Sequence, residues 1–244
     1  MTSVLPVTRT RPVGEVTGPP VVLVHGFASS VTADWPVERW ADPLALAGRE
    51  TLVVHLPGHP GGPYVEEVDD VTTWNVLRRL AEGMPSEQVD LVGYSLGARL
   101  AWDLTATRAV PVRRLVLGGL SPVEPFGRVD LVAARSIVQG GQSPVDPLTG
   151  AIAGMVTRGR AEELLRLVEG LAREPFDPGA RAPQAPTLFL AGADDPMAGG
   201  VERLVARIPH ALLQHVPGDH RSALTGAEFR DAVFQFLGVL SSQS

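Results

Sequence analysis

The chain has 244 residues, of which 44% are hydrophobic, and its formal net charge is −6. This length and composition predict one α/β domain with a small insertion, and the interspersed charges predict no nucleic-acid partner. The chain contains no cysteine, which excludes disulfides and thiolate metal sites. Because the sequence shows neither a signal-peptide pattern nor an apolar run of membrane-spanning length, we expect a cytoplasmic protein without a membrane partner.

Apolar segments of strand length recur along the chain. Residues 4–17 alternate weakly and contain two prolines, which predicts two short strands at a sheet edge. The run from Pro20 to Phe27 is almost continuously apolar, as expected for a central parallel strand that is covered on both faces. Further strands are predicted over residues 51–56, 88–93, 112–118, 187–192 and 211–216.

Segments with helical patterning separate these strands. Helices are predicted over residues 34–46, with Asp34 as the N-cap, and over 71–82, 96–107, 201–208 and 227–240. This alternation of strand and helix predicts a doubly wound, mostly parallel sheet. Ligands of such sheets bind beyond the carboxyl ends of the strands, so we expect the functional residues in the loops that begin there.

The alternation stops between Ser121 and about Pro186, a stretch that contains eight prolines and no strand pattern. Three short helical patterns lie between these prolines, around residues 131–138, 148–155 and 164–171. We interpret residues 121–185 as a helical cap inserted after a sheet strand. Residues 1–120 and 186–244 then form the two parts of the core. The alternative is a set of ordinary crossover helices packed against the sheet.

The segment Gly93-Tyr94-Ser95-Leu96-Gly97 lies between a predicted strand and a predicted helix. G-x-S-x-G in this context is typical of a nucleophile elbow, in which a serine lies on a strained turn. Glycines two residues away relieve the crowding of the adjacent backbone. The following helix directs its first N–H groups at a developing oxyanion. Ser95 is therefore the candidate nucleophile.

A serine hydroxyl becomes nucleophilic when a base takes its proton, and that base needs an orienting carboxylate. Asp194 and Asp195 follow one late strand, and His220 follows the last strand. The order Ser, Asp, His along the chain differs from the orders in chymotrypsin and subtilisin and is that of α/β hydrolases. His210 and His215 lie before and within the last strand and fit the role of base poorly.

These motifs resemble the α/β-hydrolase fold superfamily over nearly the whole chain outside the cap. The segment His25-Gly26-Phe27 resembles the family's oxyanion loop, and Pro57-Gly58-His59 resembles its loop after the next strand. The match of Gly192-x-x-Asp195 to the acid loop favours Asp195 over Asp194. The chain departs from the family at Asp219, where a glycine usually precedes the histidine.

The resemblance implies roles for several residues. Ser95, Asp195 and His220 would form the catalytic triad, and the backbone N–H groups of Phe27 and Leu96 would form the oxyanion hole. His25 would hold the oxyanion loop in shape, and it is also a candidate for substrate binding.

Arg99 follows Ser95 by four residues, a position near the pocket floor that is usually small or apolar in this family. The menaquinone-pathway succinyl-hydroxy-cyclohexadiene-carboxylate synthases have an arginine there after a similar elbow. Arg99 is therefore a candidate for substrate binding, together with Tyr94. The alternative is a helix-surface arginine paired with Asp103. Arg128 and Arg135 of the cap could supply the further substrate-carboxylate arginine of these synthases, but neither can be aligned.

We expect a serine hydrolase that cleaves a small carboxylic ester or thioester and has a small-molecule substrate as its partner. No metal and no organic cofactor is expected, and a metal site at His55 and His59 would lack a carboxylate at ligand spacing. Two alternatives are a carbon–oxygen lyase like the menaquinone-pathway enzyme and a non-catalytic ligand receptor on the same fold. The sequence does not predict the oligomeric state.

Overall fold

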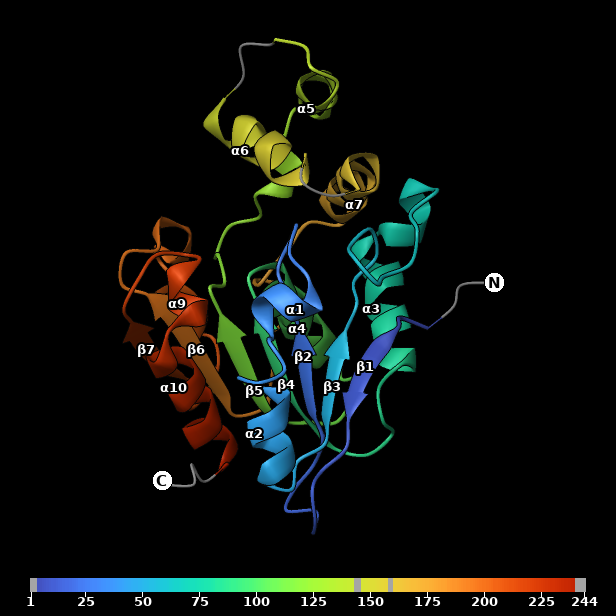
Figure 1. Cartoon of the computed structure of the whole chain (residues 1–244). Helices are drawn as coiled ribbons and strands as arrows, with labels where there is room; N and C mark the ends of the chain where they lie inside the picture. Colours follow the sequence, from blue (N-terminus) through green and yellow to red (C-terminus); the bar gives the residue numbers. More distant parts are fainter. Residues whose placement is uncertain (1–3, 143–145, 158–159, 240–244) are drawn as a thin grey trace.

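The computed structural model describes residues 4–142, 146–157 and 160–239. A seven-stranded sheet with the order β1-β3-β2-β4-β5-β6-β7 forms its centre (Figure 1). Strand β1 pairs antiparallel with β3, and all other neighbours are parallel. The strands are β1 Val7–Thr10, β2 Val21–Val24, β3 Thr51–Val54, β4 Val89–Tyr94, β5 Val112–Gly118, β6 Thr187–Gly192 and β7 Leu212–Val216.

Helices cover both faces of the sheet, as predicted for a doubly wound fold. Alternate residues of one strand enter opposite cores: Val22 packs with the α3 and α4 side chains, and Leu23 packs with those of α2 and α10. Strands β2, β3, β4 and β6 are buried along their whole length, which explains their continuous apolar character. The core helices are α1 Val31–Asp34, α2 Ala41–Leu46, α3 Thr73–Glu82, α4 Leu96–Thr107, α8 Glu202–Val205, α9 Ser222–Thr225 and α10 Ala227–Leu237.

Three further helices follow β5 and precede β6, and they lie beyond the carboxyl ends of the strands (Figure 1). They are α5 Leu131–Val138, α6 Pro147–Val156 and α7 Ala161–Arg173, and short 3₁₀ turns form at Val68–Val71, Phe126–Arg128 and Pro196–Ala198. Helix α7 contacts the loop after β3, where the Glu163 carboxylate accepts from Val65 N at 3.0 Å. This position above the strand ends is that of a cap over a site, rather than that of crossover helices on a sheet face.

The structure corrects the prediction for residues 4–17. They form one strand, β1, because the chain after Pro12 leaves the sheet and bonds to the end of α2. Val13 N donates to Ala45 O at 2.8 Å, and Thr17 N donates to Gly48 O at 3.0 Å.

The structure also corrects the single helix predicted over residues 34–46, which is two short helices, α1 and α2. Pro36 cannot continue a helix and restricts the residue before it. Ser30, rather than Asp34, is the N-cap of α1 and accepts from Ala33 N at 3.1 Å. The Asp34 carboxylate is thereby available to the neighbouring loop.

Elsewhere the differences are at element ends. Helix α8 is shorter than predicted, the one-turn helix α9 was not predicted, and α10 ends at Leu237 because Gly238 adopts a φ of 71°. Helix α3 begins two residues later than predicted, after the side chain of Thr72 caps it. Within the part of the chain that the structure describes, no helix has the length and apolar character required to cross a bilayer.

Candidate active site

Ser95 lies on the sharp turn between β4 and α4, with a φ of 52° and a ψ of −113°. A positive φ is strained for a residue with a Cβ atom, and such strain gathers at functional sites. A Cβ on Gly93 would collide with the Gly97 carbonyl, and one on Gly97 would collide with the Val24 carbonyl. The two glycines of the motif are therefore required for α4 to begin this close to β4 and β2.

The structure brings Ser95, His220 and Asp195 together from three different loops. The Ser95 Oγ atom lies 2.9 Å from His220 Nε2, and His220 Nδ1 lies 2.7 Å from Asp195 Oδ2. Asp195 Oδ1 also accepts from Met197 N at 2.8 Å, which fixes the carboxylate. Asp194 is exposed and does not contact the histidine ring in the described hydrogen bonds. The geometry is thus that of a nucleophile, a base and an orienting carboxylate.

In the loop after β2, the backbone amides on either side of Phe27 are bonded to side chains. Gly26 N donates to Asp34 Oδ2 at 2.7 Å, and Ala28 N donates to His59 Nε2 at 2.9 Å. Among the hydrogen bonds of the described residues, the Phe27 amide has no acceptor. The Leu96 amide, the first of α4, has no acceptor within that helix. Two N–H groups beside Ser95 are therefore available to an oxyanion.

Two buried histidines shape this loop. His25 lies between Gly26 O, 2.9 Å from its Nδ1, and Leu56 N, which donates to its Nε2 at 3.2 Å. His59 is held by Pro57 O, 2.9 Å from its Nδ1. Each ring needs a neutral tautomer with the proton on Nδ1, and burial lowers the pKa of both, that of His59 to about 3. His25 does not line the cavity at Ser95, so its prediction as a substrate-binding residue is wrong and its structural role fits the contacts.

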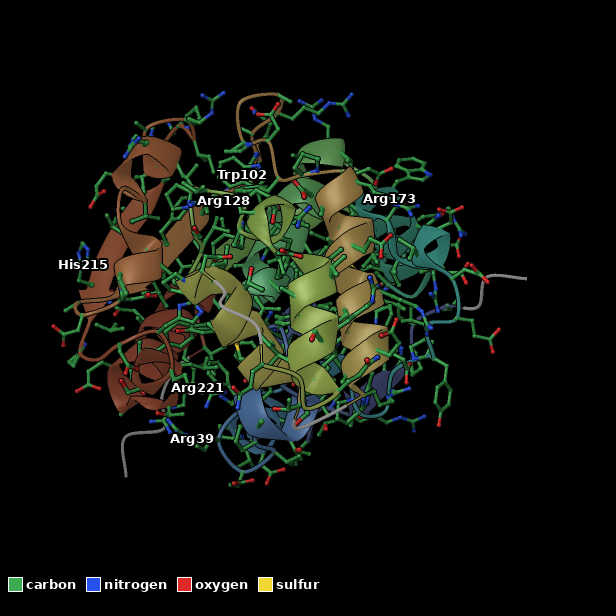
Figure 2. The ribbon with its side chains drawn as sticks, turned by 90° about the horizontal axis from the view of Figure 1, so that it is seen from above. Arg39, Trp102, Arg128, Arg173, His215 and Arg221 are labelled. Carbon is green, nitrogen blue, oxygen red and sulfur yellow. The ribbon has the colours of Figure 1, made fainter. Side chains whose placement is uncertain are left out.

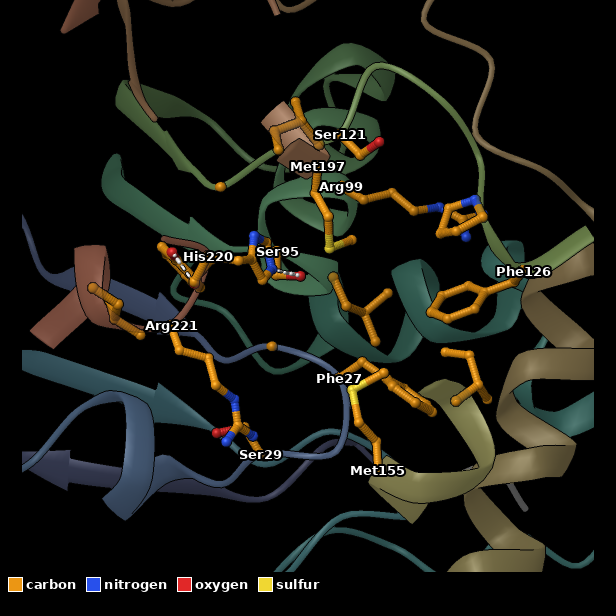
Figure 3. A pocket seen from close by; sticks show the side chains of 18 of the residues that line it. Phe27, Ser29, Ser95, Arg99, Ser121, Phe126, Met155, Met197, His220 and Arg221 are labelled. Carbon is orange, nitrogen blue, oxygen red and sulfur yellow. Dashed lines mark hydrogen bonds between the residues drawn. The ribbon is translucent and has the colours of Figure 1, made fainter. Parts of the chain in front are cut away.

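A cavity of about 420 Å³ opens at Ser95 beneath the cap (Figure 3). Its wall is mostly apolar on the side of Phe27 and Phe126, and Tyr94, Arg99 and Arg221 also line it. The volume lies within the range of ordinary small-molecule sites. No cluster of three or more histidine and carboxylate side chains able to hold a metal occurs among the residues that the structure describes.

Comparison with known proteins gives the family. A family model described as alpha/beta hydrolase fold matches residues 19–151, more than half of the chain. The chain belongs to the alpha/beta hydrolase fold family. The match begins before β2 and continues through the elbow into the cap, so it includes Ser95 and the Phe27 loop. No curated protein sequence gives a significant match to this α/β-hydrolase-fold chain.

Solved structures of the same fold are similar at low sequence identity. MenH from S. aureus has a TM-score of 0.73 at 19% identity, over 95% of this chain and 97% of that one. The enol-lactonase from Burkholderia xenovorans LB400 has a TM-score of 0.70 at 17% identity, over 95% and 96%. A thioesterase domain from the curacin biosynthetic pathway has a TM-score of 0.64 at 19% identity, over 94% of each chain. At these identities the likeness concerns the fold.

Tyr94 lines the cavity of this α/β-hydrolase-fold site, but its hydroxyl donates to the His220 carbonyl at 2.6 Å. Burial, together with the nearby carboxylates, raises the pKa of Tyr94, so the phenol stays protonated and remains a donor. Tyr94 thus positions the histidine loop, and its ring contributes to the cavity wall.

Arg99 is buried, with 4% of its surface exposed, so the alternative of a helix-surface arginine is wrong. Its NH1 atom lies 2.6 Å from Glu124 Oε2, and Asp103 lies farther away at 3.9 Å. The pairing with Glu124 is electrostatic rather than a well-aligned hydrogen bond. Arg99 NH2 donates to Thr73 Oγ1 and to Glu174 O, both at 2.8 Å. The arginine therefore joins the core to the two connections of the cap.

Neither cap arginine considered as a substrate ligand lines the cavity. Arg128 is exposed, and Arg135 pairs with Glu162 and Glu169 on the cap surface. Two residues that matter to the site were missed: Asp34, which holds the Phe27 loop, and Glu124, which neutralises Arg99. Asp34 carried only a helix-capping signal, and Glu124 lies among prolines in a connection without periodic pattern.

Proposed function

We propose that this chain is a serine hydrolase that cleaves a small carboxylic ester or thioester through an acyl-enzyme. The observation that carries the proposal is the continuous hydrogen-bonded line from Ser95 through His220 to Asp195 at the wall of the cavity. Ser95 Oγ attacks the acyl carbon, and His220 Nε2 takes the hydroxyl proton. Asp195 keeps the imidazole in the tautomer that accepts this proton and stabilises the charged ring.

Attack places negative charge on the former carbonyl oxygen. The N–H groups of Phe27 and Leu96 would stabilise this oxyanion, an effect often worth about 3–4 kcal/mol per donor. The intermediate then collapses, and the alcohol or thiol leaves with the proton from His220. Water attacks the acyl-enzyme with His220 again as the base, which releases the acid and restores the Ser95 hydroxyl.

The surroundings of Arg99 favour this hydrolase over the lyase alternative. A lyase that resembles the menaquinone-pathway enzyme would use the arginine to bind a substrate carboxylate. Here Glu124 already supplies a carboxylate at 2.6 Å, and NH2 donates three hydrogen bonds. A substrate anion would have to displace a buried partner, which costs several kcal/mol. The alternative of a non-catalytic receptor is disfavoured by the aligned serine, histidine and aspartate.

The test combines ester turnover with active-site labelling. We expect the purified chain to hydrolyse p-nitrophenyl butyrate steadily and to react with a fluorophosphonate probe at Ser95. Ser95→Ala should abolish both, whereas Ser121→Ala should keep the labelling, because Ser121 lines the same cavity but, among the described residues, its hydroxyl bonds only to Val123. Turnover that persists in folded Ser95→Ala, or a wild-type protein that neither turns over the ester nor is labelled, would refute the proposal.

A further inference from the structure

The cavity contains two arginines in different electrostatic states. Arg99 is neutralised by Glu124 and buried. Arg221 follows His220 directly and is exposed at the cavity wall, and no described carboxylate lies within ion-pair distance of it. Within the described residues it is thus the one cation lining the cavity that lacks an anionic partner.

The two carboxylates near Arg221 bind backbone amides and serine hydroxyls, and neither forms a described ion pair with the guanidinium. Asp219 accepts from Ser222 N at 2.8 Å and from Ser222 Oγ at 2.7 Å, and these bonds lower its pKa to about 2. Asp219 also accepts from the backbone amide of Arg221 at 2.9 Å, and this bond fixes the backbone of Arg221. Asp34, the other carboxylate on this side of the cavity, binds Gly26 N and the Ser29 hydroxyl. The Arg221 guanidinium is therefore free to bind an anion from the cavity.

The two sides of Ser95 differ in chemistry (Figure 3). Phe27, Phe126 and Met155 lie on one side, and His220 with Arg221 lies on the other, where the arginine extends along the rim toward Ser29. Seen from the cap, Arg128 and Arg173 lie across the cap helices from Arg221 (Figure 2). The polar side is therefore formed by Arg221 and not by the cap arginines.

The side on which the leaving group lies follows from the proposed mechanism. The departing oxygen or sulfur must be close to His220 Nε2, which gives it a proton. The acyl group then fills the apolar side, and the remainder of the leaving group passes Arg221. A guanidinium binds carboxylate or phosphate oxygens through paired N–H donors.

We propose that Arg221 is a specificity residue that binds an anionic group, a carboxylate or phosphate, on the leaving alcohol or thiol of the substrate. This inference rests on the proposed hydrolase function. It assigns anion recognition to the leaving-group side and to Arg221, whereas the resemblance to the lyase suggested Arg99.

The test uses two esters with the same acyl group, 4-butyryloxybenzoate and its uncharged methyl ester, and it follows release of the phenol, so that only cleavage of the butyryl ester is measured. For each enzyme we take the ratio of kcat/KM for the anionic ester to that for the neutral ester. General effects on folding or on Ser95 change both esters alike and cancel in this ratio. We expect Arg221→Gln to lower the ratio about three- to tenfold, in keeping with a partly exposed charge pair, and Arg221→Glu to lower it further.

Arg11→Gln removes one positive charge from an exposed position outside the cavity and is the matched control. An unchanged ratio in Arg221→Gln, or an equal fall in Arg11→Gln, would overturn the inference. If the neutral ester is turned over in a Ser95-dependent way but the ratio is unchanged in Arg221→Gln, only the role of Arg221 is refuted, and the hydrolase proposal stands.

A binding measurement tests the role of Arg221 without turnover. In the Ser95→Ala background, calorimetry should show that Arg221→Gln weakens binding of 4-butyryloxybenzoate about three- to tenfold relative to the methyl ester. If Arg221→Gln leaves the affinity for 4-butyryloxybenzoate relative to that for the methyl ester unchanged, the inference is overturned, whatever the enzyme activity. An absence of Ser95-dependent turnover would refute the hydrolase proposal, and this binding result would still decide whether Arg221 recognises the anion.

Discussion

Glu124→Gln is expected to destabilise this fold strongly, although it replaces one atom. The Glu124 carboxylate faces Arg99 and also accepts from two backbone amides, Phe126 N at 2.8 Å and Phe176 N at 2.9 Å. Phe126 lies at the start of the cap and Phe176 lies just after α7. One carboxylate thus connects both cap connections to a buried cation of the core.

The magnitude follows from the burial of the pair. At 2.6 Å, opposite charges attract by about 6 kcal/mol with an effective dielectric constant of 20. The side chains of Arg99 and Glu124 are only 5% and 10% exposed, so water cannot replace the lost partner. Asp103, 3.9 Å from the guanidinium, would recover part of the loss. We therefore expect the free energy of unfolding to fall by about 3–5 kcal/mol, as for other broken buried pairs.

Urea unfolding at pH 7.5, followed by circular dichroism, measures this change. Glu169→Gln is the control, because Glu169 also forms two ion pairs with arginines but is 28% exposed, and it should cost less than about 1 kcal/mol. The double variant Arg99→Met/Glu124→Gln should be more stable than Glu124→Gln, since it removes the unpaired charge. A loss below about 1 kcal/mol in Glu124→Gln, or a double variant no more stable than that single variant, would refute the reasoning.

Two further changes test the histidine loops. Because burial lowers the pKa of His59 to about 3 from 6.5, its contribution to stability is fully present above pH 6.5 and is lost as the pH falls toward 3, by about 2 kcal/mol between pH 6.5 and 5. Asp103, whose pKa burial raises to about 6, changes the stability in the opposite sense, but it does so equally in wild type and in His59→Gln. The difference in stability between these two proteins therefore reports on His59 and should shrink on acidification. An unchanged difference would contradict a neutral buried His59. Tyr94→Phe removes the 2.6 Å bond to the His220 carbonyl and should cost about 1 kcal/mol in urea unfolding and lower kcat several-fold with little change in KM. Wild-type kcat in Tyr94→Phe would show that the hydroxyl does not position the base.

The sequence predicted those features that depend on local pattern. Strands such as β4 and β6 are buried on both faces, so they are apolar at nearly every position and are recognisable without a partner. The elbow was recognisable because a strained serine between close-packed backbones requires glycine on both sides. The site order followed from topology, since the carboxyl ends of parallel strands meet at one edge of the sheet.

Features that depend on contacts between distant segments could not be predicted. The partner of Arg99 is Glu124, which is separated from it by strand β5, whereas Asp103 lies at the spacing that local rules recognise. The role of Asp34 also depends on a contact that its sequence position does not indicate. That position suggested a helix cap, but its carboxylate binds the amide of Gly26, eight residues earlier. In both cases the fold brings a carboxylate close to a donor whose position in the sequence is not related to it by helical or strand spacing.

The pairing of Arg99 changes how this residue can affect the substrate. A free guanidinium at the cavity floor would bind an anion directly and would favour a charged acyl group. Here the carboxylate of Glu124 neutralises the guanidinium and also accepts from the backbone amides of Phe126 and Phe176, two residues whose side chains line the apolar side of the cavity. Arg99 thus acts on the acyl side through the placement of the cap, and the charge available to a substrate lies on the opposite side, at Arg221. Under the proposed function, the cavity would select the acyl group by apolar shape on one side of Ser95 and the leaving group by charge on the other.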